Sequence, residues 1–170
     1  MFNSWFNKQM GMYFAYHKNP YNCAFHFVGV PLILLSVLIV LSSISIITIF
    51  NFNINIGNVL FFLLLLFYTF AIPFMGFVSI VVYFPLYWLS HNILIGSYGN
   101  MWLIAIFCFV IGWIFQFIGH IFENRKPAFF DNLLQIFMAP GFLIIELLFS
   151  AGFCKDLAVR IEKYSEQFKK

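Results

Sequence analysis

Long apolar runs separated by short polar segments dominate this sequence. The runs cover residues 27–50, 59–90, 101–122 and 132–153. A helix needs about 20 mostly apolar residues to cross the ~30 Å hydrocarbon core of a bilayer. The pattern therefore predicts an all-α protein, a polytopic helical bundle embedded in a membrane.

The run over residues 59–90 is too long for one ordinary span. It carries no charge and contains Pro73, Gly76 and Pro85. We predict two helices here that turn near Pro73 and Gly76, because proline and glycine interrupt a helix. Together with one span in each of the runs 27–50 and 101–122, this gives four spans, with polar loops at 51–58 and 91–100.

The last run, residues 132–153, is interrupted by Pro140 and Gly141. We predict a bent or re-entrant pair of short helices there, with a fifth full span as the alternative. Cytoplasmic loops are enriched in Lys and Arg, so Lys8 and Lys18 predict a cytoplasmic N-terminus. The basic residues of the tail 155–170 also favour the cytoplasm, and a fifth crossing would place that tail on the opposite side.

The chain is predicted to form a single integral-membrane domain over residues 1–170. Aromatic residues scattered among polar ones predict that residues 1–18 include a short helix lying at the membrane interface. Residues 155–170 alternate in charge and predict a solvated cytoplasmic helix.

The composition agrees with a membrane location, since 63% of the residues are hydrophobic and 9% are charged. An ordinary soluble domain carries roughly a quarter charged residues. The composition excludes a disordered chain, a disulfide scaffold and a nucleic-acid-binding domain. The short chain and its bias towards Phe, Ile, Asn and Lys favour a bacterial inner membrane, or the endoplasmic reticulum membrane if the source is eukaryotic.

One cluster of polar residues lies at the start of the first apolar run. Asn19 followed by Pro20 predicts a helix start, with the asparagine as N-cap. Asn22 and His26, four residues apart, then share one face of that helix. His17 lies just before the cap and can fold back over the same face.

A second polar cluster lies at the end of the run 101–122. Gln116, His120 and Glu123 follow one another at spacings of four and three residues, so they line one helical face. Gly112 and Gly119 on the same helix predict that a second helix packs closely against it.

Two helices that each bring a histidine and polar partners to the same membrane depth predict a metal between them. Imidazoles with a carboxylate or water suit Fe(II), Zn or Cu, and an open site of two histidines and a carboxylate points to non-haem Fe(II) and oxygen chemistry. The alternative is a hydrogen-bonded His/Glu network without redox chemistry, in a transporter or a structural membrane protein. A di-iron desaturase or hydroxylase would need more than the four histidines present.

Two further ionisable residues receive no catalytic role. His91 lies in the predicted loop 91–100, away from both clusters, and is interpreted as an interfacial histidine. Glu146 could face the bundle, pair with a lysine of the tail or mark the interface.

At these residues the chain resembles the 2-hydroxy fatty acid dioxygenase family. The resemblance extends over about residues 10–153 and includes the order of the apolar runs. Its residues are Tyr16, His17, Asn19, Asn22, His26, Gly29 and Pro31, followed by Gln116, Phe117, Gly119, His120, Glu123, Pro127 and Ala128.

The resemblance implies an Fe(II)-dependent dioxygenase of fatty-acid α-oxidation, which shortens 2-hydroxy fatty acids by one carbon with O₂. It implies Fe²⁺ as cofactor and His17, His26 and His120 as its ligands. Glu123 would be a fourth ligand or a partner that supports the ligands, and all four residues would be catalytic.

Neighbouring polar residues are expected to support that reaction. We expect Lys18, Arg125 and Lys126 to attract the substrate carboxylate, while the acyl tail lies along Phe- and Leu-rich helix faces. The residues expected to hold the ligating imidazoles in place are Asn19, Asn22 and Gln116.

Overall fold

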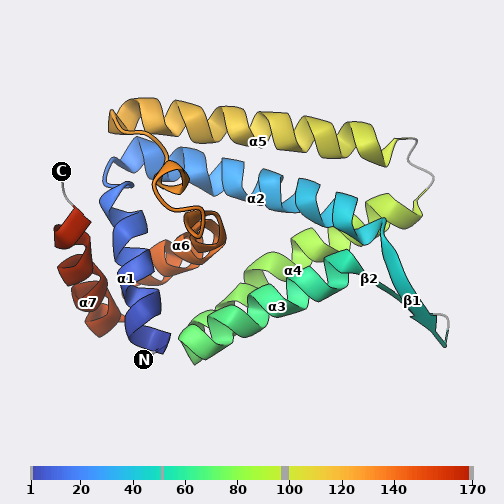
Figure 1. Ribbon diagram of the computed structural model, residues 1–170, viewed down its shortest axis with the longest axis horizontal. Coiled ribbons are helices and arrows are strands. Elements are labelled where there is room, and N and C mark those ends of the chain that lie inside the picture. Colours follow the sequence, from blue (N-terminus) through green and yellow to red (C-terminus); the bar gives the residue numbers. More distant parts are fainter. Residues whose placement is uncertain (1, 51, 97–99, 169–170) are drawn as a thin grey trace. The chain divides into compact units, whose positions relative to one another are not determined.

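The computed structural model of the protein describes residues 2–50, 52–96 and 100–168 (Figure 1). Seven α-helices and one two-stranded antiparallel sheet form within these residues, which confirms the predicted all-α class. The elements are α1 (Phe2–Ala15), α2 (Pro20–Ser42), β1 (Ser45–Ile49), β2 (Phe52–Asn55), α3 (Ile56–Ala71), α4 (Pro73–Ile95), α5 (Met101–Glu123), the 3₁₀ turn η1 (Ala128–Phe130), α6 (Gln135–Ser150), α7 (Lys155–Ser165) and the 3₁₀ turn η2 (Glu166–Phe168).

The chain divides into two compact units, and the single integral-membrane domain over residues 1–170 stays a prediction. The first unit comprises Met1–Val28 and Phe115–Lys170, and the second comprises Gly29–Ile114. Both boundaries fall inside long helices, one within α2 and the other within α5. All residues of the predicted site belong to the first unit.

In the first unit, α1 lies against α6 and α7 (Figure 1). Phe6 and Met10 of α1 and Phe142 of α6 are fully buried at these contacts. Polar contacts add to the packing, because Gln9 Oε1 accepts hydrogen bonds at 2.9 Å from the side chains of both Asn132 and Gln135. The predicted N-terminal and C-terminal helices are both confirmed.

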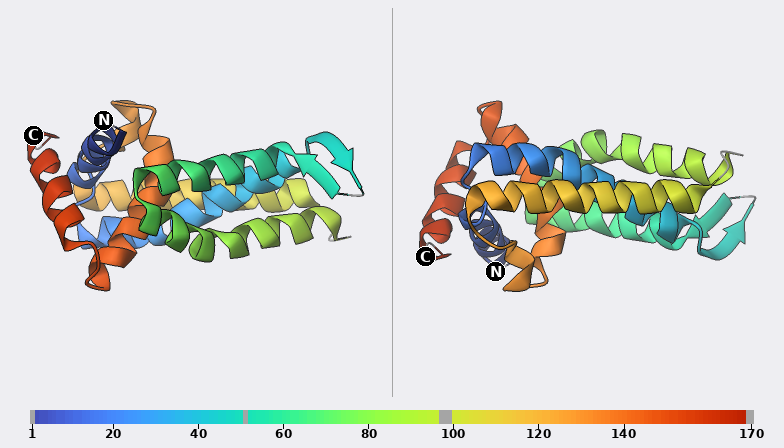
Figure 2. Two further views of the ribbon diagram at one scale, coloured as in Figure 1. Left: turned by 90° about the horizontal axis from the view of Figure 1, so that it is seen from below. Right: turned by 90° about the horizontal axis from the view of Figure 1, so that it is seen from above.

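In the second unit, α3 and α4 form a helical hairpin, seen lengthwise in Figure 2. The helices meet at Ile72, whose backbone is extended (φ −150°, ψ 108°), and Pro73 begins α4. Gly76 lies so close to α3 that a Cβ atom there would meet the Thr69 Cα at 2.6 Å. The predicted turn near Pro73 and Gly76 is therefore confirmed.

Small residues let α2 and α5 approach closely. A Cβ atom added at Gly112 would meet the carbonyl oxygen of Gly29 at 2.9 Å and Ile33 Cγ1 at 2.7 Å. One at Gly119 would meet Asn22 Oδ1 at 2.5 Å. The close helix contact predicted from the two α5 glycines is confirmed.

Within the described ranges, three helices (α2, α4 and α5) are long and apolar enough to cross a membrane, each with 23 residues. In α4 and α5, 17% and 22% of the most apolar window is buried inside the protein. So much outward-facing apolar surface is stable in lipid but not in water. At 16 residues each, α3 and α6 are shorter than the roughly 20 residues of a full crossing, and the four-span count stays a prediction.

The first predicted span is wrong at its C-terminal end. The apolar run 27–50 was expected to be helical throughout, but α2 ends at Ser42 and residues 45–49 form β1. The segment 44–49 contains four isoleucines and a threonine, and β-branched side chains favour a strand over a helix. β1 pairs with β2, so the polar loop predicted at 51–58 contains a strand and the start of α3.

The helices α4 and α6 are both longer than predicted. Since α4 continues to Ile95, His91 lies in a helix and not in a loop, and its side chain is exposed. The pair of short helices predicted for 132–153 is a single helix, α6, with Pro140 inside it. Burial of Pro140, Gly141 and Phe142 supports the helix, which offsets the backbone hydrogen bond that proline removes.

The contact between α1 and α7 predicts the membrane topology. At 14 and 11 residues the two helices are too short to span a bilayer, so helices in contact must lie on the same side of it. We expect reporters fused at the N-terminus and after Lys170 both to read cytoplasmic. A reporter inserted in the β1–β2 hairpin should read the opposite side. Opposite readings for the two termini would contradict the α1–α7 contact, and an outside reading for both would reverse the orientation.

Candidate metal centre

Three histidines from separate parts of the sequence meet inside the first unit. One ring nitrogen each of His17, His26 and His120 lie within 4.8 Å of one another. The side chains are buried, with 3%, 1% and 6% exposure. The Nε2 atoms of His17 and His26 are 3.0 Å apart, and both rings lie about 5 Å from that of His120. The predicted convergence of the three imidazoles is confirmed.

The start of α2 places two of these histidines. Asn19 Oδ1 accepts a hydrogen bond from the backbone N–H of Tyr21 at 2.9 Å, and α2 begins at Pro20. The predicted helix start is confirmed. His17 lies in the connection between α1 and α2, while His26 lies on the second turn of α2, and their rings meet at an interplanar angle of 81°.

Backbone carbonyls set the orientation of these two imidazoles. His17 Nδ1 donates to the Tyr13 carbonyl at 2.7 Å, and His26 Nδ1 donates to the Asn22 carbonyl at 2.9 Å. Because a carbonyl oxygen can only accept, each Nδ1 carries the proton and each neutral ring keeps a lone pair on Nε2. Two lone pairs facing each other at 3.0 Å repel unless a cation lies between them.

The electrostatics of His17 favour a neutral ligand. Burial, followed by the nearby imidazoles of His26 and His120, holds the pKa of His17 well below its usual value. A histidine must be neutral to bind a metal. The Nε2 atoms of His17 and His26, 3.0 Å apart, would be close enough to bind one metal ion through bonds of about 2.1 Å.

The ring of His120 also has a nitrogen that could bind a metal. Its Nδ1 is buried and has no hydrogen-bond partner among the described residues. A buried polar atom without a partner costs free energy. The orphaned nitrogen, the facing lone pairs and the neutral state of His17 all fit a cation held by the three imidazoles.

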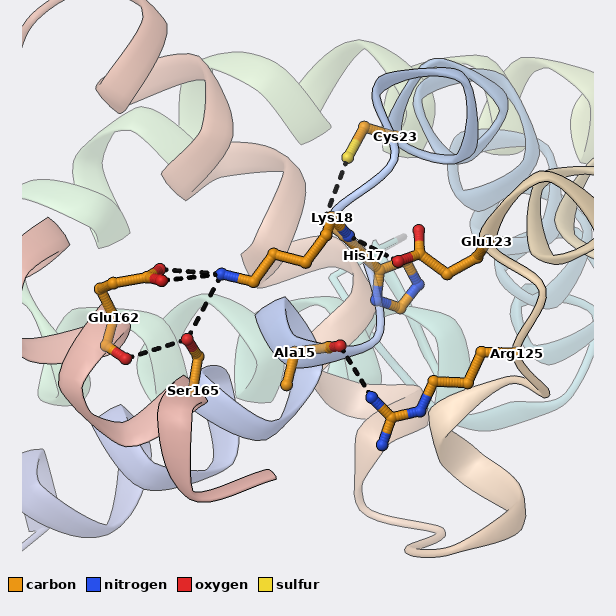
Figure 3. A network of polar contacts seen from close by, with 8 residues as sticks. All are labelled: Ala15, His17, Lys18, Cys23, Glu123, Arg125, Glu162 and Ser165. Carbon is orange, nitrogen blue, oxygen red and sulfur yellow. Dashed lines mark hydrogen bonds and ion pairs between the residues drawn. The ribbon is translucent and has the colours of Figure 1, made fainter. Parts of the chain in front are cut away.

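The Glu123 carboxylate lies outside this group and binds the start of α2 (Figure 3). Its Oε1 accepts from the backbone N–H of Lys18 at 3.0 Å, and its Oε2 accepts from the N–H of Asn19 at 2.9 Å. Oε2 also accepts from Asn22 Nδ2 at 3.0 Å. Of the two roles expected for Glu123, this geometry favours support of the ligands over a fourth ligand.

The other polar residues expected to support the ligands differ in their contacts. Asn19 Nδ2 donates to the Phe122 carbonyl at 2.9 Å and so ties α2 to α5. Asn22 orients His26 through its backbone carbonyl, while its side chain binds Glu123. Gln116 is buried, and its Nε2 has no partner within the described ranges, so the expected hydrogen bond from this amide to a ligating imidazole is not seen.

Arg125 stabilises the fold by binding backbone carbonyls. Its guanidinium donates to the carbonyls of Ala15 at 2.9 Å and Phe168 at 3.1 Å, and it lies 3.4 Å above the centre of the Tyr16 ring. The Tyr16 hydroxyl donates to Asp131. Burial, and then this hydrogen bond to Asp131, raise the pKa of Tyr16, so its hydroxyl stays protonated.

The two lysines expected to bind substrate make ion pairs at the surface. Lys18 Nζ contacts the Glu162 carboxylate at 2.9 Å and Ser165 Oγ at 3.4 Å (Figure 3). Lys126 Nζ lies 2.5 Å from Asp131. Exposed pairs of this kind contribute only about 0–1 kcal/mol, so either lysine can exchange its partner for a ligand.

A groove of about 530 Å³ reaches the histidine group. This volume lies within the roughly 300–1,000 Å³ of known ligand pockets. Four apolar residues (Phe14, Pro20, Ala24 and Phe27) and four polar ones (His17, Lys18, Cys23 and Glu146) line it. Of the three basic residues predicted to bind substrate, Lys18 lines this groove together with a histidine of the group.

Sequence reasoning missed three residues that support the site. Tyr13 stacks on His17 at 4.0 Å with an interplanar angle of 2°. Its position one helical turn before His17 was the available signal. Asp131 accepts a hydrogen bond from Tyr16, and Glu162 forms an ion pair with Lys18. These long-range pairs have no local sequence signal.

Known proteins resemble this chain over most of its length. A family model described as "2-hydroxy-palmitic acid dioxygenase Mpo1-like" matches residues 3–151. The chain belongs to this family. The Mpo1-like chain is also 35% identical over 158 residues to the 2-hydroxy-palmitic acid dioxygenase MPO1 of Saccharomyces cerevisiae. The alignment covers 91% of the chain and 86% of the yeast protein, while no solved structure matches.

Removing the Glu123 carboxylate is predicted to destabilise the site. In Glu123→Ala the N–H groups of Lys18 and Asn19 lose their acceptor, and we expect the free energy of unfolding to fall by roughly 2–3 kcal/mol. Glu123→Gln keeps one acceptor oxygen and should lose less. Denaturation in detergent measures both, with the exposed Glu166→Gln as control, and equal stability of Glu123→Ala and the control would contradict this role.

Proposed function

We propose that this protein is an Fe(II)-dependent dioxygenase of fatty-acid α-oxidation, which shortens 2-hydroxy fatty acids by one carbon using O₂. The observation that carries the proposal is the buried group of His17, His26 and His120 in a chain of the Mpo1-like family. The yeast relative, 35% identical, is a 2-hydroxy-palmitic acid dioxygenase by name, which supports the same reaction class.

The donor set supports iron as the cofactor. Three imidazoles without a thiolate suit Fe(II), Zn or Cu, and they leave coordination positions open. Among these metals, a dioxygenase needs one that is redox-active. Bound iron supplies redox reactivity and Lewis acidity, which no side chain of the site possesses.

The protein's own groups orient the ligands and exclude water. The carbonyls of Tyr13 and Asn22 hold the Nδ1 protons of His17 and His26, so that both Nε2 atoms face the centre of the group. Phe142 packs against the His17 ring, with 5.2 Å between ring centres. Tyr13 covers the same ring by stacking. Glu123 supports the group by fixing the start of α2.

The groove beside His17 supports binding of an amphipathic acid. Its Lys18 ammonium can pair with a carboxylate, while Phe14 and Phe27 offer apolar walls for an acyl tail. Arg125 is less suited to bind substrate, since its guanidinium already binds two backbone carbonyls. The long apolar helices support a membrane location, where fatty acids partition.

Metal content and product formation test the proposal together. The purified protein, reconstituted with Fe(II) without oxygen and then given 2-hydroxypalmitate and O₂, should release a fatty acid one carbon shorter. His17→Ala, His26→Ala and His120→Ala should each lower iron affinity by more than roughly tenfold, as loss of a direct ligand exceeds the effect of a supporting residue. Elemental analysis and mass spectrometry of the product are the measurements.

His91→Ala is the matched control, because His91 is exposed on α4. It should keep both iron and turnover. Unchanged iron content in all three variants of the group would overturn the assignment of the ligands. A wild-type protein that retains no metal and forms no product would favour the transporter or structural alternative.

A further inference from the structure

Glu146 of α6 lies in the groove beside the histidine group. It lines this groove with His17 and Lys18, and its side chain is half-buried. It makes no hydrogen bond or ion pair with any of the described residues, although the Lys18 ammonium is close enough to attract it. A half-buried acceptor of this kind is available for a ligand.

The other carboxylates near the site are already engaged. Glu123 accepts three hydrogen bonds at the start of α2. Asp131 binds Tyr16 and Lys126, and Glu162 binds Lys18. Glu146 therefore differs from these carboxylates, because within the described part of the chain its oxygens accept no hydrogen bond.

The groove matches an acid that carries a hydroxyl group next to its carboxylate. Lys18 provides a cation for the carboxylate, Glu146 provides an acceptor for a hydroxyl proton, and Phe14 and Phe27 provide apolar walls. An unsubstituted fatty acid has no hydroxyl to donate. Such an acid would leave the Glu146 acceptor unsatisfied, and a site built to bind a substrate hydroxyl discriminates strongly against analogues without it.

We propose that Glu146 is a specificity-determining residue, which accepts a hydrogen bond from the 2-hydroxyl group of a fatty acid in this groove. It thereby selects 2-hydroxy acids over unsubstituted ones. This inference rests on the proposed function, because it names the group that recognises the substrate of the same site. Glu146 acts on binding and does not ligate the metal.

The test compares 2-hydroxypalmitate with palmitate on the iron-loaded protein in detergent. In Glu146→Leu we expect KM for 2-hydroxypalmitate to rise about tenfold, in keeping with the loss of one hydrogen bond to a charged group. Palmitate should inhibit this variant more strongly than it inhibits the wild type. Glu146→Gln keeps an acceptor oxygen and should show an intermediate change, while the exposed Glu166→Gln should match the wild type.

A displacement assay gives a readout that does not depend on turnover. Both acids compete with a fluorescent fatty acid, and the ratio of their affinities should fall in Glu146→Leu while its iron content and thermal unfolding match the wild type. An unchanged ratio in both Glu146 variants would overturn the proposal. Loss of iron in Glu146→Gln would also overturn it, by assigning the residue to the metal group.

The two proposals fail in different ways. A wild type that does not convert 2-hydroxypalmitate would contradict the proposed function, and the displacement assay would still decide the role of Glu146. A wild type that converts 2-hydroxypalmitate, with Glu146 variants that keep its preference, would contradict only the role of Glu146.

Discussion

The carboxylate of Glu123 joins the end of α5 to the start of α2, and the histidine group depends on this contact. His17 precedes Lys18, whose N–H binds Glu123, and His120 lies one turn before Glu123 on α5. One side chain therefore sets how close imidazoles from distant parts of the sequence can come. It also satisfies backbone N–H groups at a helix start, which would otherwise lack acceptors. Gly119 complements it, since a side chain there would displace Asn22.

The sequence predicted the parts of the site that follow helical spacing. Asn22 and His26, and likewise His120 and Glu123, lie one turn apart, so their shared faces follow from the period of the helix. The Asn19–Pro20 start was also predictable, because capping is local chemistry. Asn22 was expected to orient an imidazole, but the sequence did not predict that its backbone carbonyl binds His26 while its side-chain amide binds Glu123.

The parts that the sequence did not predict depend on tertiary contacts or on competing local preferences. The segment 44–49 is apolar enough for a span, but its isoleucines favour a strand, and pairing with β2 decides between the two. Pro140 predicted a break in 132–153, and burial of its surroundings keeps α6 continuous. The sequence gives the charges of Arg125 and Lys18 but not their partners. Arg125 binds Phe168, more than 40 residues away, and Lys18 binds Glu162, more than 140 residues away.

The order of the histidines along the chain bears on biosynthesis. His17 and His26 leave the ribosome early, whereas His120 follows only after α3 and α4, and the Arg125–Phe168 contact closes at the far end of the chain. Proteins emerge N-terminus first at about 5–20 residues per second. A nascent chain thus carries an incomplete donor set for several seconds. Binding of an ion by all three imidazoles would therefore have to follow the synthesis of α5 and could not guide the earlier helices into place.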